Sequence, residues 1–73
     1  MSFSISGHVG RRIGELRVAR GLRQADLAEW LGVTPQAVSH YEAGKIHITV
    51  DRAYSASKAL GVGVAELFEG IEE

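Results

Sequence analysis

The sequence predicts an all-α fold, a compact bundle of five short helices, from three observations. Apolar residues recur three or four positions apart, glycines follow these segments where helix caps fall, and strand-like alternation is confined to residues 46–48 and 62–64. A chain of 73 residues has room for one domain. We expect that domain to span residues 8–70, between a flexible tail at 1–7 and a short tail at 71–73. A core this small favours close packing, a dimer partner, or both.

The first two helices are predicted over residues 8–20 and 24–31. An apolar stripe with helical spacing marks the buried face of the first: Val9, Ile13 and Leu16. The second buries Leu27, Ala28 and Leu31. Gly21 and Gly32 follow the two segments in the position of a C-terminal cap, where glycine adopts positive φ without strain.

The third helix begins at Thr34-Pro35 and stops before Gly44, with Val38 and Tyr41 inside. Threonine caps a helix start, and proline fits the first helical position because its missing N–H costs nothing there. Thr49 caps a fourth helix that carries a stripe closing at Gly61, formed by Val50, Ala53, Ala56 and Leu60. A fifth is expected over 64–69, anchored by Leu67 and Phe68.

Charge is unevenly distributed along the chain, although the formal net charge is only −1. Residues 1–24 carry five arginines and one glutamate, whereas residues 46–73 carry two cations and five acids. The basic pole of such a molecule can bind phosphates, while the acidic pole contacts solvent or a partner. The alternative is that both poles are ordinary solvated faces.

Several functional classes are disfavoured by residues that are missing or wrongly spaced. There is no cysteine, which excludes disulfides and thiolate metal sites, and no apolar run reaches the length of a membrane span. No signal peptide is evident, so we expect a cytoplasmic protein.

The histidines His8, His40 and His47 share no helical face, so no metal is expected. Ser39 and His40 are adjacent and point apart, no phosphate-binding loop is present, and the glycines are assigned to helix ends. We expect no enzyme and no cofactor.

The most informative stretch is 24–43, where two helices are joined by the turn Gly32-Val33-Thr34. Such a short turn forces the helices to cross steeply, and Ala28 permits the close approach. Four side chains are left on the outer face of the third helix, polar or short enough to meet base edges: Pro35, Gln36, Ser39 and His40.

The residues at these spacings resemble the phage repressor and Cro-like helix-turn-helix family, of the xenobiotic-response-element type. The resemblance runs from Val9 to about Gly70. It is carried by Arg17, Gly21-Leu22-Arg23-Gln24, Leu27-Ala28, Leu31-Gly32-Val33, Val38-Ser39, Tyr41-Glu42, Gly44-Lys45 and Lys58-Ala59-Leu60-Gly61-Val62. It implies a lambda-repressor-like fold of four or five helices, in which the second and third bind double-stranded DNA in the major groove.

The resemblance also implies roles for matching residues. Gln24 reaches a phosphate while bracing the third helix, and Arg17 pairs with Glu42 in a structural role. The expected DNA-binding set is Arg23, Gln24, Thr34, Pro35, Gln36, Ser39, His40 and Lys45. Pro35 departs from the polar residue common in the family and leaves an apolar surface for a thymine methyl, and Gln36 suits an adenine. For His40 and Lys45, a plain solvated side chain is the alternative.

Useful specificity from so small a module requires two copies on a pseudo-palindromic operator. The expected dimer surface is C-terminal: Val62, Val64, Leu67, Phe68 and Ile71. The alternative is that these side chains complete the monomer core. The sequence thus predicts a homodimeric regulator, a repressor or an activator. The other hypothesis is a protein-interaction module such as an antitoxin, which binds a cognate toxin. Trp30 and Tyr54 are candidates for such a contact unless they cover the first helix or the tail.

Overall fold

The computed structural model describes residues 4–71 and contains no strand within them, which confirms the all-α class. The elements are α1 (Ile5–Ala19), α2 (Gln24–Leu31), α3 (Pro35–Ala43), α4 (Val50–Leu60) and a 3₁₀ turn, η1 (Val64–Phe68). The expected count of five α-helices is therefore wrong by one. In the last segment the Glu66 N–H bonds to the Gly63 carbonyl, the i→i+3 pattern of a 3₁₀ helix.

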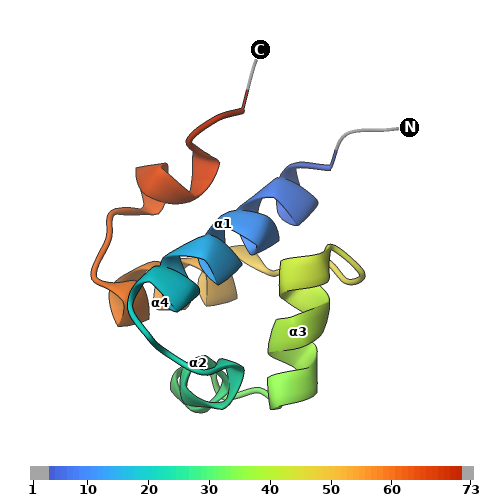
Figure 1. Cartoon of the computed structure of the whole chain (residues 1–73). Coiled ribbons are helices and arrows are strands. Elements are labelled where there is room, and N and C mark those ends of the chain that lie inside the picture. The colour runs from blue at the N-terminus through green and yellow to red at the C-terminus, as the bar shows by residue number, and fades with distance from the viewer. Residues whose placement is uncertain (1–3, 72–73) are drawn as a thin grey trace.

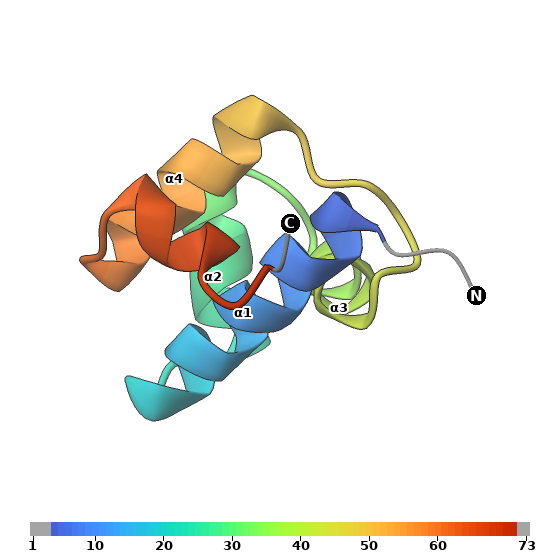
Figure 2. The same ribbon diagram turned by 90° about the horizontal axis from the view of Figure 1, so that it is seen from above.

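The elements pack around α1, which contacts α3, α4 and η1 (Figure 1). Helix α2 packs against α3 and α4 on the other side of the molecule. Seen from above, η1 lies along α4 and crosses back over α1 (Figure 2). This arrangement leaves one long side of α3 uncovered by any other helix.

Helix α1 begins at Ile5, three residues earlier than the sequence predicted. The Ser4 hydroxyl accepts a hydrogen bond from the Gly7 N–H at 3.1 Å, which satisfies one of the unpaired donors at the helix start. Residues 5–7, expected in the flexible tail, therefore belong to α1. Ser4 caps that helix, and residues 1–3 of the tail lie outside the described residues.

The core is built from the faces that the apolar spacing predicted. Its buried hydrophobic residues are Val9, Ile13, Leu27, Ala28, Val38, Tyr41, Ala53, Ala56, Leu60 and Leu67. Two expected core residues are exposed, Val50 at 85% and Phe68 at 44%. Leu16 and Leu31, also expected to be buried, are half-buried and pack against the core. Val50 is the first residue of α4, where no neighbouring element covers it, and η1 is too short to bury both Leu67 and Phe68.

Three glycines lie inside α1 rather than at helix ends, contrary to expectation: Gly7, Gly10 and Gly14. They line the side of α1 that meets α3. A Cβ on Gly10 would lie 1.8 Å from the Tyr41 carbonyl oxygen, and one on Gly14 would lie 3.1 Å from the Glu42 side chain. Glycine at these positions lets the two helix backbones touch.

No helix within residues 4–71 is long and apolar enough to cross a membrane. Over the same described residues, no three histidine or acidic side chains gather in a way that would hold a metal ion.

Candidate nucleic-acid interface

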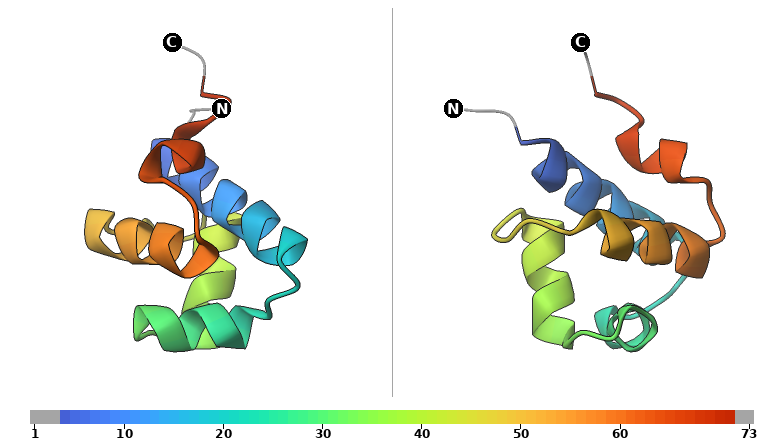
Figure 3. Two further views of the ribbon diagram at one scale, coloured as in Figure 1. Left: turned by 90° about the vertical axis from the view of Figure 1, so that its left-hand side faces the viewer. Right: turned by 180° about the vertical axis from the view of Figure 1, so that it is seen from behind.

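Helices α2 and α3 cross steeply, as the short turn predicted (Figure 3). Gly32 ends α2 in the left-handed conformation at φ 71°, and the Val33 N–H returns to the Ala28 carbonyl at 3.0 Å. Leu27, Ala28 and Val38 are each only 1% exposed, so a shared core fixes the crossing. The two helices therefore form one rigid unit.

The first turn of α3 is accessible to solvent. Thr34 caps the helix by accepting the Ala37 N–H at 3.1 Å, and Pro35 occupies the first helical position. Pro35 and Gln36 are exposed, whereas Ser39 and His40 are half-buried one turn later. A surface of this kind presents one apolar ring and several hydrogen-bonding groups to whatever docks on it.

A hydrogen-bonded ion pair ties α1 to α3. Arg17 Nε lies 2.7 Å from Glu42 Oε2, and Arg17 Nη2 lies 3.1 Å from Glu42 Oε1, so both carboxylate oxygens are engaged. The two side chains are only 13% and 12% exposed. Hydrogen bonding to Glu42 raises the pKa of the Arg17 guanidinium, which stays charged.

The same network reaches α2. Arg17 Nη1 donates to the Leu22 carbonyl at 2.6 Å, and Gln24 Nε2 donates to Glu42 Oε1 at 3.0 Å. Glu42 is thus the point at which three helices meet through polar contacts. Gln24 braces α3 as expected, and its amide sits beside the start of α2.

Arg23, expected to face DNA, is engaged within its own helix. Its guanidinium lies 2.9 Å from Asp26 Oδ1, and its backbone N–H donates to Asp26 Oδ2 at 2.8 Å. Arginine has no acceptor with which to cap α2, so Asp26 supplies the capping contact from three residues inside. Sequence reasoning missed Asp26, although an acid three residues after a helix start indicates this contact.

Arg12, one cation of the basic pole, is held by an acid of its own helix and by the C-terminal segment. Arg12 pairs with Glu15 at 2.9 Å, lies 3.7 Å from Glu69, and donates from Nε to the Glu66 carbonyl at 3.2 Å. Arg12 thereby fastens η1 to α1 rather than facing a phosphate. Lys45, just beyond α3, is exposed and adjacent to the turn that ends that helix.

The residues expected at a dimer surface divide between core and surface. Leu67 is fully buried, so its assignment to that surface is wrong for this fold: η1 docks on α1 and α4 through it. Val62 is half-buried and packs against the core, and Ile71 is half-buried. Val64 and Phe68 remain 37% and 44% exposed.

A steep helix pair with a polar, accessible first turn on its second helix defines the helix-turn-helix class of DNA-binding domain. The helix-turn-helix family model matches residues 13–67. The chain belongs to this family, in its Cro-like, xenobiotic-response-element branch, and the resemblance drawn from the sequence is confirmed.

Its relatives are described as transcriptional regulators. A regulator in the ATPase CF(0) region of Rhodospirillum rubrum is 37% identical over 93% of this chain and 63% of its own length. A helix-turn-helix regulator of Rickettsia conorii is 38% identical over 94% of this chain and 55% of its own. The chain therefore spans about half to two thirds of these relatives.

Two solved structures share the fold. The clp gene regulator ClgR of C. glutamicum superposes with a TM-score of 0.83 at 26% identity, covering 90% of this chain and 86% of that one. The restriction-modification controller protein C.AhdI of Aeromonas hydrophila gives 0.81 at 30% identity, covering 90% and 100%. The chain carries the DNA-binding domain of transcriptional regulators.

Proposed function

We propose that this domain binds a pseudo-palindromic operator as a homodimer, with α3 in the major groove, and that it acts as a transcriptional repressor. The observation that carries the proposal is the rigid α2–α3 unit with the first turn of α3 exposed. A reading helix must be held at a fixed angle while its base-contacting side chains stay accessible. The Arg17–Glu42–Gln24 network supplies the first condition and the Pro35–Gln36 turn supplies the second.

Within this proposal the side chains of α3 have different tasks. The Gln36 amide pairs with an adenine edge, the Pro35 ring meets a thymine methyl, and Ser39 and His40 contact bases or phosphates further along the helix. These contacts select the sequence.

The flanks of the unit hold the phosphate backbone. Gln24 sits at the start of α2, where free N–H groups and the helix dipole attract a phosphate. Lys45 offers its charge in an exposed position after α3. Arg23 exchanges its contact with Asp26 for one with a phosphate, or keeps both. These contacts set the overall affinity without selecting the sequence.

Selection from a random duplex library with the full chain at moderate salt is the first test. The expected result is an inverted repeat whose half-sites lie about one helical turn, ~34 Å, apart. No enrichment by folded protein would overturn the proposal.

Substitutions of two glutamines then distinguish contacts with bases from contacts with the phosphate backbone. Gln36→Ala should relax preference at one base-pair position, at a cost of about 1–3 kcal/mol, while Gln24→Ala should weaken binding to all duplexes alike. Uniform weakening by both variants would remove Gln36 from the reading surface.

A protein partner is the second candidate function, and the position of Trp30 favours it. This side chain is 65% exposed on α2, and exposed tryptophan is typical of protein interfaces. Salt distinguishes the two functions. DNA binding should weaken steeply with added salt as counterions are released, whereas an apolar protein contact should change little. A Trp30→Ala variant with unchanged DNA affinity but no partner binding would support the second function.

A further inference from the structure

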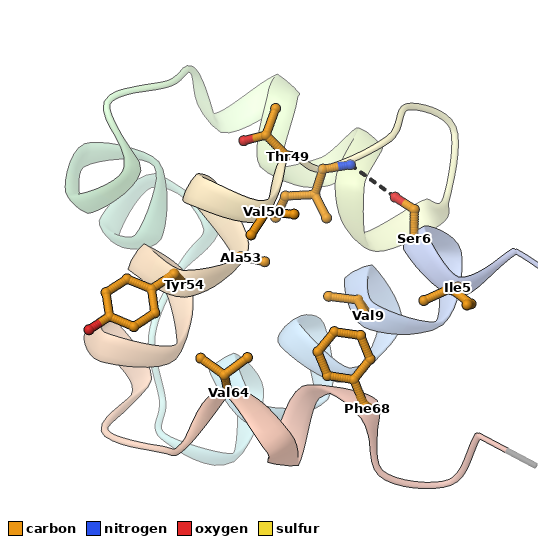
Figure 4. Close-up of a pocket in the computed structure, with 10 residues that line it drawn as sticks. Ile5, Ser6, Val9, Thr49, Val50, Ala53, Tyr54, Val64 and Phe68 are labelled. Carbon is orange, nitrogen blue, oxygen red and sulfur yellow. Dashed lines mark hydrogen bonds between the residues drawn. The ribbon is translucent and has the colours of Figure 1, made fainter.

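The two ends of α1 belong to different kinds of surface. The start of α1 lines an apolar groove of about 250 Å³, together with the start of α4 and η1 (Figure 4). No charged side chain is among the residues that line this groove, and the hydroxyls of Ser6 and Thr49 are engaged in accepting backbone N–H groups. The groove therefore offers no cation to a phosphate, whereas the other end of α1 does.

The chain around the end of α1 is basic. Residues 16–25 contain three arginines and no acid, a formal charge of +3: Arg17, Arg20 and Arg23. The end of α1 also projects beyond the other helices when the molecule is seen from above (Figure 2). A projecting segment with this charge attracts the phosphates of DNA before any contact forms.

Most arginines of α1 and of the start of α2 are already paired with an acid. The pairs are Arg11–Glu15, Arg12–Glu15, Arg17–Glu42 and Arg23–Asp26. Within residues 4–71 no acid pairs with Arg20, which is exposed and reaches only the Leu16 carbonyl, at 3.5 Å. Its guanidinium can therefore turn to a phosphate without giving up an ion pair.

The backbone of Arg20 is nevertheless held in place, and Arg17 holds it. The Arg17 carbonyl accepts the N–H groups of Arg20 and Leu22, each at 3.1 Å, and Arg17 Nη1 donates to the Leu22 carbonyl at 2.6 Å. Gly21 turns the chain between them at φ 69°. Because Arg17 also pairs with Glu42 of α3, the connection that carries Arg20 is tied to the helix proposed to read the bases.

Arg20 lies near the phosphate contact proposed for the start of α2. Only residues 21–23 separate it from Gln24, so their Cα atoms lie no more than about 14 Å apart. Along one DNA strand a phosphate follows every ~3.4 Å of helix axis. A cation at this separation is within reach of a phosphate a few nucleotides from the one that Gln24 approaches.

We propose that Arg20 binds a backbone phosphate beside each half-site of the operator. The assignment rests on the DNA binding of the proposed function and adds a contact to it. Arginine suits this position because its planar guanidinium can engage two phosphate oxygens at once. A phosphate contact carries no sequence information, so Arg20 raises the affinity for every duplex and leaves the base preference to α3.

The salt dependence of operator binding by the full chain tests the assignment. Each phosphate contact contributes ~0.9 to the slope of log K against log salt concentration. Arg20→Gln should make that slope less steep by ~0.9 for each molecule bound, and should weaken binding by about tenfold per molecule at ~0.1 M salt. Lys58→Gln, which removes the same charge from an exposed position of α4, is the matched control and should keep the wild-type slope.

Two further measurements separate a phosphate contact from an effect on the fold. Arg20→Lys keeps the charge and should keep the slope. Neutral methylphosphonates, placed one at a time beside the half-site, should include one position that weakens the wild type and leaves Arg20→Gln unaffected.

The outcomes also separate this assignment from the proposed function. A wild-type slope in Arg20→Gln, or an equal change in Lys58→Gln, would overturn the role of Arg20 while DNA binding stands. A folded wild type that binds no duplex would overturn the proposed function and the role of Arg20 with it.

Discussion

At the scale of single residues, Glu42 is the most consequential polar group in the described structure. It accepts hydrogen bonds from Arg17 on α1 and from Gln24 on α2 while belonging to α3. With only 12% of its side chain exposed, solvent screens these contacts weakly. The network therefore fixes the angle of α3 relative to the other two helices.

Glu42→Gln should lower the free energy of unfolding by about 1–3 kcal/mol, because it leaves the half-buried Arg17 charge without its counter-ion. Urea denaturation followed by circular dichroism measures the change. Glu29→Gln, the same substitution at an exposed position of α2, is the control and should change stability by less than about 0.5 kcal/mol. Equal effects of the two variants would show that the pair contributes nothing.

Asp26 gives the start of α2 a dependence on pH. Hydrogen bonds from the Arg23 side chain and then from its backbone lower the pKa of this carboxyl from its ordinary value of 3.8. A pKa lowered by folding means that the carboxylate stabilises the native state at neutral pH. This contribution is complete above 3.8 and is lost as the pH falls through the lowered pKa.

Asp26→Asn should therefore cost stability at pH 7 and progressively less towards pH 2, as the pH falls through the lowered pKa and the wild-type carboxyl becomes protonated. Thermal melts of both proteins between these pH values check the prediction. A difference in Tm that stays constant with pH would mean that the charge of Asp26 plays no part.

At the scale of elements, the close crossing of α1 and α3 requires glycine on α1, because a side chain there would separate the two backbones. The Tyr41 carbonyl approaches Gly10 so closely that a single methyl group would overlap it. Neither element can yield easily: α3 is tied by Glu42, and Tyr41 is 6% exposed in the core. The position of the reading helix is thus set by backbone contact as well as by side-chain packing.

Gly10→Ala should force α1 and α3 apart and cost more than about 2 kcal/mol, despite the better helix propensity of alanine. Chemical denaturation measures it. Gly63→Ala is the control, since nothing lies within 4 Å of a Cβ there and its φ is −76°. A stabilised Gly10→Ala protein would contradict the close approach.

At the scale of the whole molecule, the small core gives the domain only a small free energy of unfolding. A chain of 73 residues buries few large side chains, and η1 contributes only Leu67, which is fully buried between α1 and α4. The Arg12 contacts with Glu66 and Glu69 hold the same segment from outside. Leu67 is therefore the main attachment of the C-terminal segment to the domain.

Leu67→Ala should cost about 2–5 kcal/mol through lost burial and the cavity left behind. In a domain of this size such a loss is a large part of the total stability. Calorimetry should show a strongly lowered Tm, whereas Phe68→Ala, one residue on and 44% exposed, should cost much less. The reverse order would mean that η1 is held through Phe68 instead.

The sequence by itself determined α2, α3 and α4 of this protein and its family. Caps and breakers act locally, so Thr34, Pro35 and Gly44 fix α3 wherever it packs, and apolar spacing identifies buried faces such as Val9 and Ile13. The Arg17–Glu42 pair was predicted through the family resemblance, and the structure contains it.

Tertiary structure alone decided what depends on neighbours distant in sequence. Gly10 acts as a contact point because α3 passes over it, Val50 is exposed because nothing covers the start of α4, and Leu67 is buried where Phe68 is not. The pairing of Arg12 with η1 and the apolar groove have the same origin. Exposure, close approach and long-range pairing are properties of how elements meet, whereas capping and periodicity are properties of the chain itself.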